Sequence, residues 1–331
     1  MTLRQIRGIP KIELHVHLEG TFTPSRVTAL AAHAGEAPPR PIDRLYDVDS
    51  LADFLDTLDW VCGLVRDEPT AEAVAHDFAI YARDQGIVYA EVIVNPTHWS
   101  GLSPAELFRA CARGFDRAES HGLGDFRLLP SILRQQSGQE ALALVAWIGE
   151  ADIARIVGLS IDGNEVASGR TGPRFAAAYE QAARLGLGRT AHAGESSGAD
   201  GVRDAIELLG VSRIDHGVRC GEDHEVLEMV LDRNITLNVC LTSNCTLLYP
   251  ELDAHPIRQL AEAGVSYTIN SDDPETLGVS LCSELALASE HLDWQLQDLI
   301  AAQARAIDAA FCSAEKKREL RDLVDGYVVG T

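Results

Sequence analysis

Eight short apolar segments, each followed by a segment with helical spacing, constrain the fold of this chain most strongly. They have the length and character of strands, and they lie at residues 12–17, 87–95, 126–132, 156–162, 189–193, 213–216, 235–240 and 265–270. A regular alternation of strands and helices predicts parallel strands joined by right-handed connections. The sequence therefore predicts an α/β fold, the (β/α)8 or TIM barrel, with further helices after the last strand.

The segment at residues 38–66 is longer than the connection between a strand and the next helix requires. Prolines at positions 38, 39 and 41 end the preceding helical pattern, and apolar residues from Leu51 to Val65 recur at helical spacing. We expect this helical insertion either to cover the site as a lid or to pack against the barrel. No linker or composition break divides the chain, so residues 1–331 are predicted to form a single domain.

The charge balance argues against a nucleic-acid partner, because 28 lysines and arginines face 50 aspartates and glutamates. The first residues lack the apolar run of a signal peptide, and no stretch of about 18 apolar residues is present. The seven cysteines are odd in number and form no C-x-x-C pair, which favours reduced thiols. We therefore expect a cytoplasmic protein that binds neither nucleic acid nor a membrane.

His15 and His17 lie at the end of the first predicted strand. Alternate side chains of a strand point to the same face, so these two imidazoles can supply two nitrogens to one metal ion. Taken alone, such a pair is more often solvated or hydrogen-bonded than metal-bound. What favours a metal is the set of polar motifs that follow later strands.

Those motifs lie where the strands of a barrel end, which is the face that carries active sites. They are residues 162–165, 192–195, 215–217 and 271–274. The predicted zinc ligands are three histidine nitrogens and one carboxylate: His15, His17, His192 and Asp272. One position stays open for water, which is typical of a catalytic zinc site. The chain has three lysines, and none lies near the end of the fourth strand to bridge a second metal, so one zinc ion per chain is expected.

Four further residues are predicted to act around the metal. His216 would orient or deprotonate the zinc-bound water, whose pKa zinc lowers towards about 7. Glu195 would be the general acid, Asp273 would hold a polar edge of the substrate, and Gly163 would let a flat ring approach the backbone. Each has a structural alternative, such as a helix cap for Asp273 or a hydrogen-bonded core histidine for His216.

The motifs together resemble the adenosine deaminase family of the amidohydrolase superfamily. The matching segments are residues 10–20, 156–165, 190–195, 213–217, 242–244 and 270–274, in the order of the family. The resemblance implies hydrolytic deamination of a 6-aminopurine by zinc-bound hydroxide, which attacks C6 and releases ammonia. By the same resemblance Glu195 protonates N1, Asp273 holds N7, the amide of Gly163 meets N3, and His216 and Asp272 align the hydroxide.

The substrate is less sharply predicted than the chemistry. Adenosine-specific members of the family usually carry Asp where this chain has Glu19, at a position that resembles the one meeting the ribose 5′-hydroxyl. Glu at this position resembles the branch of the family that acts on adenine or on modified adenosines. Asn164 and Leu241 also depart from the usual Asp and Pro of the family. We expect a small-molecule 6-aminopurine substrate, with an adenosine-type nucleoside first and free adenine or a 5′-modified adenosine such as aminodeoxyfutalosine as the alternative.

The sequence leaves open two alternative functions of other kinds. A related barrel could hydrolyse an amide or a phosphoester, but phosphoester chemistry favours cationic clamps, and Arg219 is the one cation near these motifs. A catalytically inactive barrel used for binding would be expected to lack Glu195 or a metal ligand, and the sequence keeps all of them.

Overall fold

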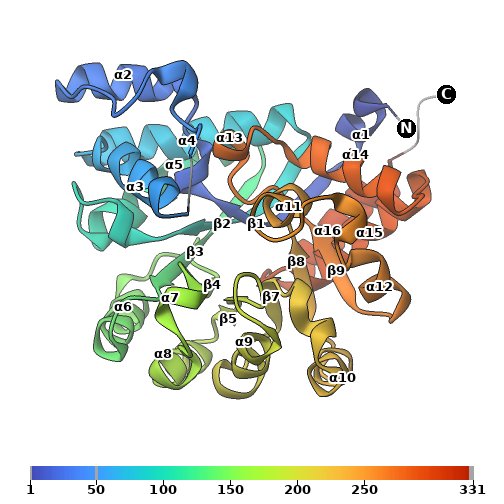
Figure 1. Cartoon of the computed structure of the whole chain (residues 1–331). Helices are drawn as coiled ribbons and strands as arrows, with labels where there is room; N and C mark the ends of the chain where they lie inside the picture. Colours follow the sequence, from blue (N-terminus) through green and yellow to red (C-terminus); the bar gives the residue numbers. More distant parts are fainter. Residues whose placement is uncertain (1, 49–50, 328–331) are drawn as a thin grey trace.

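The computed structural model describes residues 2–48 and 51–327, and its strands lie at the centre of the molecule with helices around them (Figure 1). The strands are β1 (Lys11–His17), β2 (Ile87–Val94), β3 (Asp125–Leu133), β4 (Gly158–Asp162), β5 (Gly188–Arg189), β6 (His192–Ala193), β7 (Arg213–His216), β8 (Thr236–Val239) and β9 (Ser266–Ile269). Every pair of neighbouring strands is parallel, in the orders β1-β2-β3-β4-β5 and β6-β7-β8-β9.

Nine strand segments correspond to the eight predicted strands, because β5 and β6 are two pieces of the fifth. The residues between them stay in the sheet: the amide of Thr190 donates to the carbonyl of Leu159 at 3.0 Å, and that of Asp215 donates to the carbonyl of Ala191 at 2.9 Å. The break therefore interrupts the regular pairing without opening the barrel.

The barrel closes where the chain leaves β9 and meets β1. Val16 and Asp272 form a parallel bridge, the amide of His17 donates to the carbonyl of Asp272 at 2.8 Å, and the amide of Asp272 donates to the carbonyl of His15 at 3.2 Å. The first and last strands thus meet at the residues predicted to bind metal. The predicted (β/α)8 barrel is confirmed.

The helices that follow the strands cover the outside of the barrel (Figure 1). The α-helices are α1 (Leu3–Gly8), α2 (Pro24–Ala34), α3 (Leu51–Gly63), α4 (Glu68–Asp84), α5 (Pro104–Ser120), α6 (Gly138–Ala151), α7 (Glu165–Ser168), α8 (Gly172–Arg184), α9 (Ala199–Asp204), α10 (His224–Asp232), α11 (Leu241–Leu247), α12 (Ile257–Glu262), α13 (Pro274–Leu277), α14 (Leu281–His291), α15 (Leu296–Ala309) and α16 (Ala314–Asp325). Among the described residues, no helix is long and apolar enough to cross a bilayer.

Short helical turns complete the connections. The 3₁₀ turns are η1 (Leu18–Thr21), η2 (Ile42–Arg44), η3 (Pro96–His98), η5 (Val218–Glu222) and η6 (Leu252–Ala254), and Ala205–Leu209 is a π-helical turn that extends α9. The predicted insertion at residues 38–66 contains η2 and α3, and its residues 49 and 50 lie outside the described part of the chain. Helix α3 packs beside η1 and η3, at the end of the barrel where the predicted site lies.

Buried residues explain why the strands are so apolar. Six of the seven residues of β1 and seven of the eight residues of β2 are buried, as expected for parallel strands covered by helices outside and by side chains inside. At the end of the barrel away from the site, the Arg213 guanidinium lies 2.6 Å from Glu91 and stacks on the ring of Phe311, whose centroid is 3.6 Å away. This packed layer closes one end and leaves the other to the site.

Candidate active site

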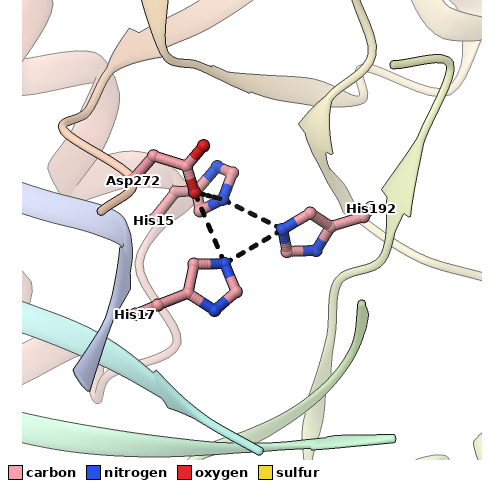
Figure 2. Close-up of side chains that lie close together, drawn as sticks. All are labelled: His15, His17, His192 and Asp272. Carbon is pink, nitrogen blue, oxygen red and sulfur yellow. Dashed lines mark hydrogen bonds and ion pairs between the residues drawn. The ribbon is translucent and has the colours of Figure 1, made fainter. Parts of the chain in front are cut away.

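Three histidines and one aspartate from three parts of the barrel meet at its centre (Figure 2). The Nε2 atoms of His15 and His17 each lie 3.1 Å from Nε2 of His192. Oδ1 of Asp272 lies 3.1 Å from Nε2 of His15 and 3.4 Å from Nε2 of His17. Ligand atoms about 2.0–2.1 Å from a zinc ion in tetrahedral geometry are separated by about 3.3 Å. The spacing of these four atoms therefore fits one zinc ion.

The hydrogen bonds on the far side of the rings explain why the Nε2 atoms converge. Nδ1 of His192 lies 2.9 Å from the carbonyl of Ile161, and Nδ1 of His15 lies 3.2 Å from the carbonyl of Asn238. A carbonyl oxygen is only an acceptor, so each Nδ1 carries the proton and each Nε2 keeps its lone pair. Lone pairs that face one another repel unless a cation lies between them. The donor set thus fits a metal chemically as well as by distance.

Electrostatics favours neutral rings at His17 and His192 and an ionised carboxylate at Asp272. Burial lowers the pKa of His17 and holds the pKa of His192 well below its ordinary value. Burial alone would raise the pKa of Asp272, but the adjacent histidines, His15 first, hold it well below its usual range. For these three residues they are the protonation states that zinc requires. At His15 burial is outweighed by the charges of Asp272 and Asp215, which raise its pKa to about 10, so these carboxylates favour a positive charge at this nitrogen, and a metal cation can supply it.

A second group of candidate ligands, His15, His216 and Cys240, shares one residue with the first. The Cys240 sulfur lies 3.4 Å from Nδ1 of His15, the nitrogen that already faces a carbonyl. Burial raises the pKa of Cys240 well above its ordinary value, so the sulfur stays a thiol and is a poor ligand. We therefore assign the cation to the first group.

Backbone strain marks two of the predicted residues. Asp272 has φ of 61° and His216 has φ of 64°, a region that residues other than glycine rarely adopt. His216 is the last residue of β7 and Asp272 lies three residues beyond the end of β9, where such strain is held by the surrounding structure. At Asp272 the two backbone hydrogen bonds to β1 hold it. The strained backbone turns the two side chains towards the centre of the site.

Glu195 and His216 lie beside the metal ligands. Nε2 of His216 is 3.4 Å from Oε1 of Glu195 and 3.7 Å from Oδ2 of Asp272. Burial raises the pKa of Glu195, although the neighbouring His216 opposes the shift. A carboxyl group with a raised pKa can carry a proton near neutral pH and deliver it, which is what a general acid must do.

Asp273 and Gly163 line the same end of the barrel as the metal ligands. Burial first, and then the charge of Asp272, raise the pKa of Asp273 well above its ordinary value, and its buried Oδ1 has no hydrogen-bond partner in the described part of the chain. Gly163 has φ of 94°, and a Cβ there would lie 3.0 Å from Leu133. A glycine is therefore required at this position.

Glu19 is held at the edge of the site by two donors. Its Oε1 accepts the indole N–H of Trp99 at 2.7 Å and the backbone N–H of Asn95 at 2.8 Å. Its Oε2 is buried and has no partner among the described residues. Gly20 packs against the backbone of Asp273, because a Cβ added at Gly20 would lie 2.6 Å from Cα of Asp273. This contact places Glu19 and Asp273 near each other at the same end of the barrel.

The structure brings together every residue predicted from the strand ends, and it adds residues that were not singled out. Asn95, Trp99, Ser197, His255 and Glu284 all hydrogen-bond to parts of the site or to segments that carry it. Asn95 could have been found, because it ends the second predicted strand. Nothing in the sequence around His255 or Glu284 distinguishes them from other buried polar residues.

Comparisons with known proteins agree with this geometry. The model of the family described as adenosine deaminase matches residues 10–327. An adenine deaminase of Rhodospirillum rubrum is 33% identical over 323 residues, which cover 95% of this chain and 96% of that protein. An aminodeoxyfutalosine deaminase of Acidothermus cellulolyticus is 34% identical, with 96% of this chain and 92% of that protein covered. The crystal structure of an amidohydrolase from Burkholderia ambifaria with bound zinc is similar, with a TM-score of 0.88, 27% identity and coverage of 98% and 94%.

Proposed function

The chain belongs to the adenosine deaminase family, and from this membership and the geometry of its site we propose that it deaminates free adenine. The class of reaction is common to the family: a metal-dependent hydrolysis that replaces the amino group of an adenine-type base by oxygen. The choice of adenine among such substrates, and the roles of single side chains, are our proposal. One observation carries the choice: the buried, unpaired carboxylate oxygen of Glu19.

Zinc would be held by three neutral imidazoles and one carboxylate: His15, His17, His192 and Asp272. When bound, zinc lowers the pKa of a water molecule so that hydroxide becomes available near neutral pH. The remaining side chains act on the purine and on the attacking water. Glu195, whose pKa burial raises, gives its proton to ring nitrogen N1 and so makes C6 more electrophilic. His216 and Asp272 orient the water towards C6, and the amino group leaves as ammonia.

Two further contacts would hold the ring in place. A protonated Asp273 can donate to N7, which is an acceptor when adenine carries its imidazole proton on N9. The backbone at Gly163 can approach N3 closely because no side chain intervenes there. Together with Glu195 at N1, these contacts would pair the acceptor nitrogens of the ring with donors and place C6 near the metal.

Glu19 supports adenine over its nucleosides. Free adenine has an N–H on the imidazole ring, and in adenosine that nitrogen carries ribose instead. Burial raises the pKa of Glu19 to about 7, and in the ionised form its Oε2, which has no partner among the described residues, can accept this hydrogen. An acceptor left buried and unpaired costs about 1–3 kcal/mol. The side chain cannot turn away easily, because Trp99 and Asn95 hold its other oxygen. It is also one methylene longer than the aspartate typical of adenosine-specific relatives, and so takes up room that ribose would need.

The test is ammonia release by the zinc-loaded protein with adenine, adenosine and aminodeoxyfutalosine, compared by kcat/KM. We expect adenine to be the best substrate and Glu19→Asp to lower kcat/KM for adenine by about tenfold, the effect of one hydrogen bond. Glu262→Asp, at an exposed position of α12, is the matched control and should change nothing. A higher kcat/KM for adenosine or for the 5′-modified nucleoside would overturn the proposal.

A further inference from the structure

A chain of buried hydrogen bonds lies behind His216, on the side away from the metal ligands. Nδ1 of His216 is 3.1 Å from Nδ2 of Asn244, and Oδ1 of Asn244 is 3.2 Å from Nε2 of His255. Nδ1 of His255 in turn lies 3.1 Å from the backbone nitrogen of Ile257. Both His255 and Asn244 are buried, with exposed fractions of 3% and 0%. Each of these polar groups must therefore find its partner within the chain.

The last hydrogen bond of this series determines which group donates and which accepts in the others. A backbone N–H can only donate, so Nδ1 of His255 is the acceptor of the bond from Ile257. Burial lowers the pKa of His255 to about 4, which keeps the ring neutral near neutral pH. A neutral imidazole with a lone pair on Nδ1 carries its proton on Nε2. His255 therefore donates to the carbonyl oxygen of Asn244.

The bond from His255 also fixes the orientation of the side-chain amide of Asn244. Because Oδ1 of Asn244 accepts from His255, the group that faces His216 is the amide NH₂, which only donates. Nδ1 of His216 must then be an acceptor. A neutral His216 consequently holds its proton on Nε2, the nitrogen that faces Glu195 at 3.4 Å and Asp272 at 3.7 Å. An Nε2–H group can donate to these carboxyl oxygens, whereas a lone pair there would be repelled by the ionised Asp272.

The helix that carries Asn244 is itself fixed. Helix α11 begins at Leu241, and the backbone N–H of Thr242 donates to Oε2 of Glu284 at 3.1 Å, while the Thr242 hydroxyl also donates to Glu284. Glu284 lies on α14 and is buried. The bonds from Thr242 to Glu284 fix the start of the helix that carries Asn244. The side-chain amide of Asn244 cannot flip without breaking its hydrogen bond to His255.

We propose that His255, acting through Asn244, is a positioning residue that fixes His216 as the Nε2–H tautomer, so that His216 donates a hydrogen bond to the attacking water instead of removing its proton. The consequence for catalysis depends on the proposed function, but the tautomer itself does not. The sequence allowed either role for His216, and this chain of bonds selects the orienting one. The proton that water loses can then pass to Glu195, which is a carboxylate once it has protonated N1 and whose Oε1 lies 3.4 Å from Nε2 of His216, and from there to the amino group that leaves as ammonia.

The direct test is the tautomer of His216 in zinc-loaded protein with ¹⁵N-labelled histidine, read from the couplings of ring protons to Nδ1 and Nε2. The signals are assigned with His216→Gln. We expect the Nε2–H form in the wild type. In Asn244→Asp a carboxylate oxygen faces Nδ1, so we expect the proton to move to Nδ1. An Nδ1–H tautomer in the wild type, or an unchanged tautomer in Asn244→Asp, would overturn the proposal.

Kinetics supply the second measurement. Asn244→Asp should lower kcat for adenine by at least about tenfold, with KM and zinc content unchanged, because it alters the donor at the attacking water and not the purine contacts. His255→Leu should do the same, and His255→Gln, which keeps an N–H donor, should recover part of kcat. Asn234→Asp, at an exposed position, is the matched control. Wild-type kcat in both Asn244→Asp and His255→Leu would contradict the proposal.

Failure of the proposed function would look different. If none of the purines is deaminated but His216 still shows the Nε2–H form and Asn244→Asp still shifts it, the positioning role of His255 is supported and the assigned reaction alone is wrong.

Discussion

Glu165 holds Glu195 by its backbone: Oε2 of Glu165 accepts the N–H of Glu195 at 2.9 Å. The same carboxylate accepts the N–H of Gly194 at 3.1 Å and both the N–H and the hydroxyl of Ser197, at 3.1 and 2.9 Å. Burial would raise the pKa of Glu165, but Arg134 and these donors outweigh it and lower the pKa. An ionised carboxylate thus shapes the turn that presents the proposed general acid.

Glu165→Gln should lower kcat for adenine by about 10- to 100-fold. Glutamine has one acceptor oxygen, so in either orientation its NH₂ replaces one carboxylate oxygen and faces a backbone N–H that it cannot accept: that of Gly194, or those of Glu195 and Ser197. Each buried N–H left unpaired costs about 1–3 kcal/mol. We expect zinc content to stay at the wild-type level, because the described hydrogen bonds of the Glu165 carboxylate go to Gly194, Glu195 and Ser197 and not to a ligand side chain. Steady-state kinetics and metal analysis check this. The control is Glu150→Gln on the exposed side of α6, and loss of zinc together with kcat would show a structural role instead.

The sequence could predict that the proposed metal ligands lie together, because the topology of the barrel determines where the strands end. Parallel strands bring their carboxyl ends to one face, so His15, His192 and Asp272 meet although any two of them are at least 80 residues apart in sequence. Substrate contacts were harder to predict. The orientation of Glu19 depends on Trp99, whose indole N–H reaches it across 80 residues, and no local pattern encodes such a contact.

The hydrogen bonds behind the site could not be predicted for a related reason. His255 follows the turn η6 and lies outside every strand, so the periodicity that located His192 does not apply to it. Its partner Asn244 lies on a helix whose start is fixed by Glu284 of α14. These contacts arise from packing between loops and helices that follow different strands, and packing of that kind is decided by the whole fold.

Activity should fall at alkaline pH in a way that depends on Glu195. Its pKa is raised by burial, and only the protonated form can give a proton to N1. The sign follows directly: kcat/KM is full below this raised pKa and is lost as pH rises through it. Glu195→Gln should keep zinc, lower kcat by about 10²- to 10⁴-fold and abolish this alkaline limb. The pH profile of kcat/KM checks both, and a variant with near-normal turnover would exclude Glu195 as the acid.

His17→Ala should lose metal, activity and stability together. Removing one of four ligands leaves an incomplete set, and a bound ion at about 1,000 times its dissociation constant stabilises the folded state by about 4 kcal/mol. The measurement is zinc content, ammonia release and Tm with and without a chelator: the chelator should lower Tm of the wild type and leave that of His17→Ala unchanged. His224→Ala, whose side chain is 84% exposed, is the control. A His17→Ala protein that is active without metal would contradict the zinc assignment.

The contact between Asp59 and His98 joins the inserted helix α3 to the turn after β2. Oδ1 of Asp59 lies 2.5 Å from Nδ1 of His98. Burial lowers the pKa of His98, but this hydrogen bond and the nearby carboxylates together outweigh burial and raise the pKa. Glu19, which holds the substrate in our proposal, is a second charged neighbour of His98, and Asp162 is a third. If α3 acts as a lid, this pair helps to hold it over the bound purine.

Asp59→Asn should therefore raise KM for adenine by about two- to fivefold and leave kcat unchanged, since an ion pair with one exposed partner contributes about 0.2–1 kcal/mol. The charged pair exists below the raised pKa of His98 and is lost as pH rises through it, so KM of the wild type should rise in that direction and KM of Asp59→Asn should not. Asp56→Asn, also on α3, is the control. A fall in Tm with KM unchanged would instead assign residues 38–66 to packing, because substrate affinity would then be independent of how firmly α3 is held.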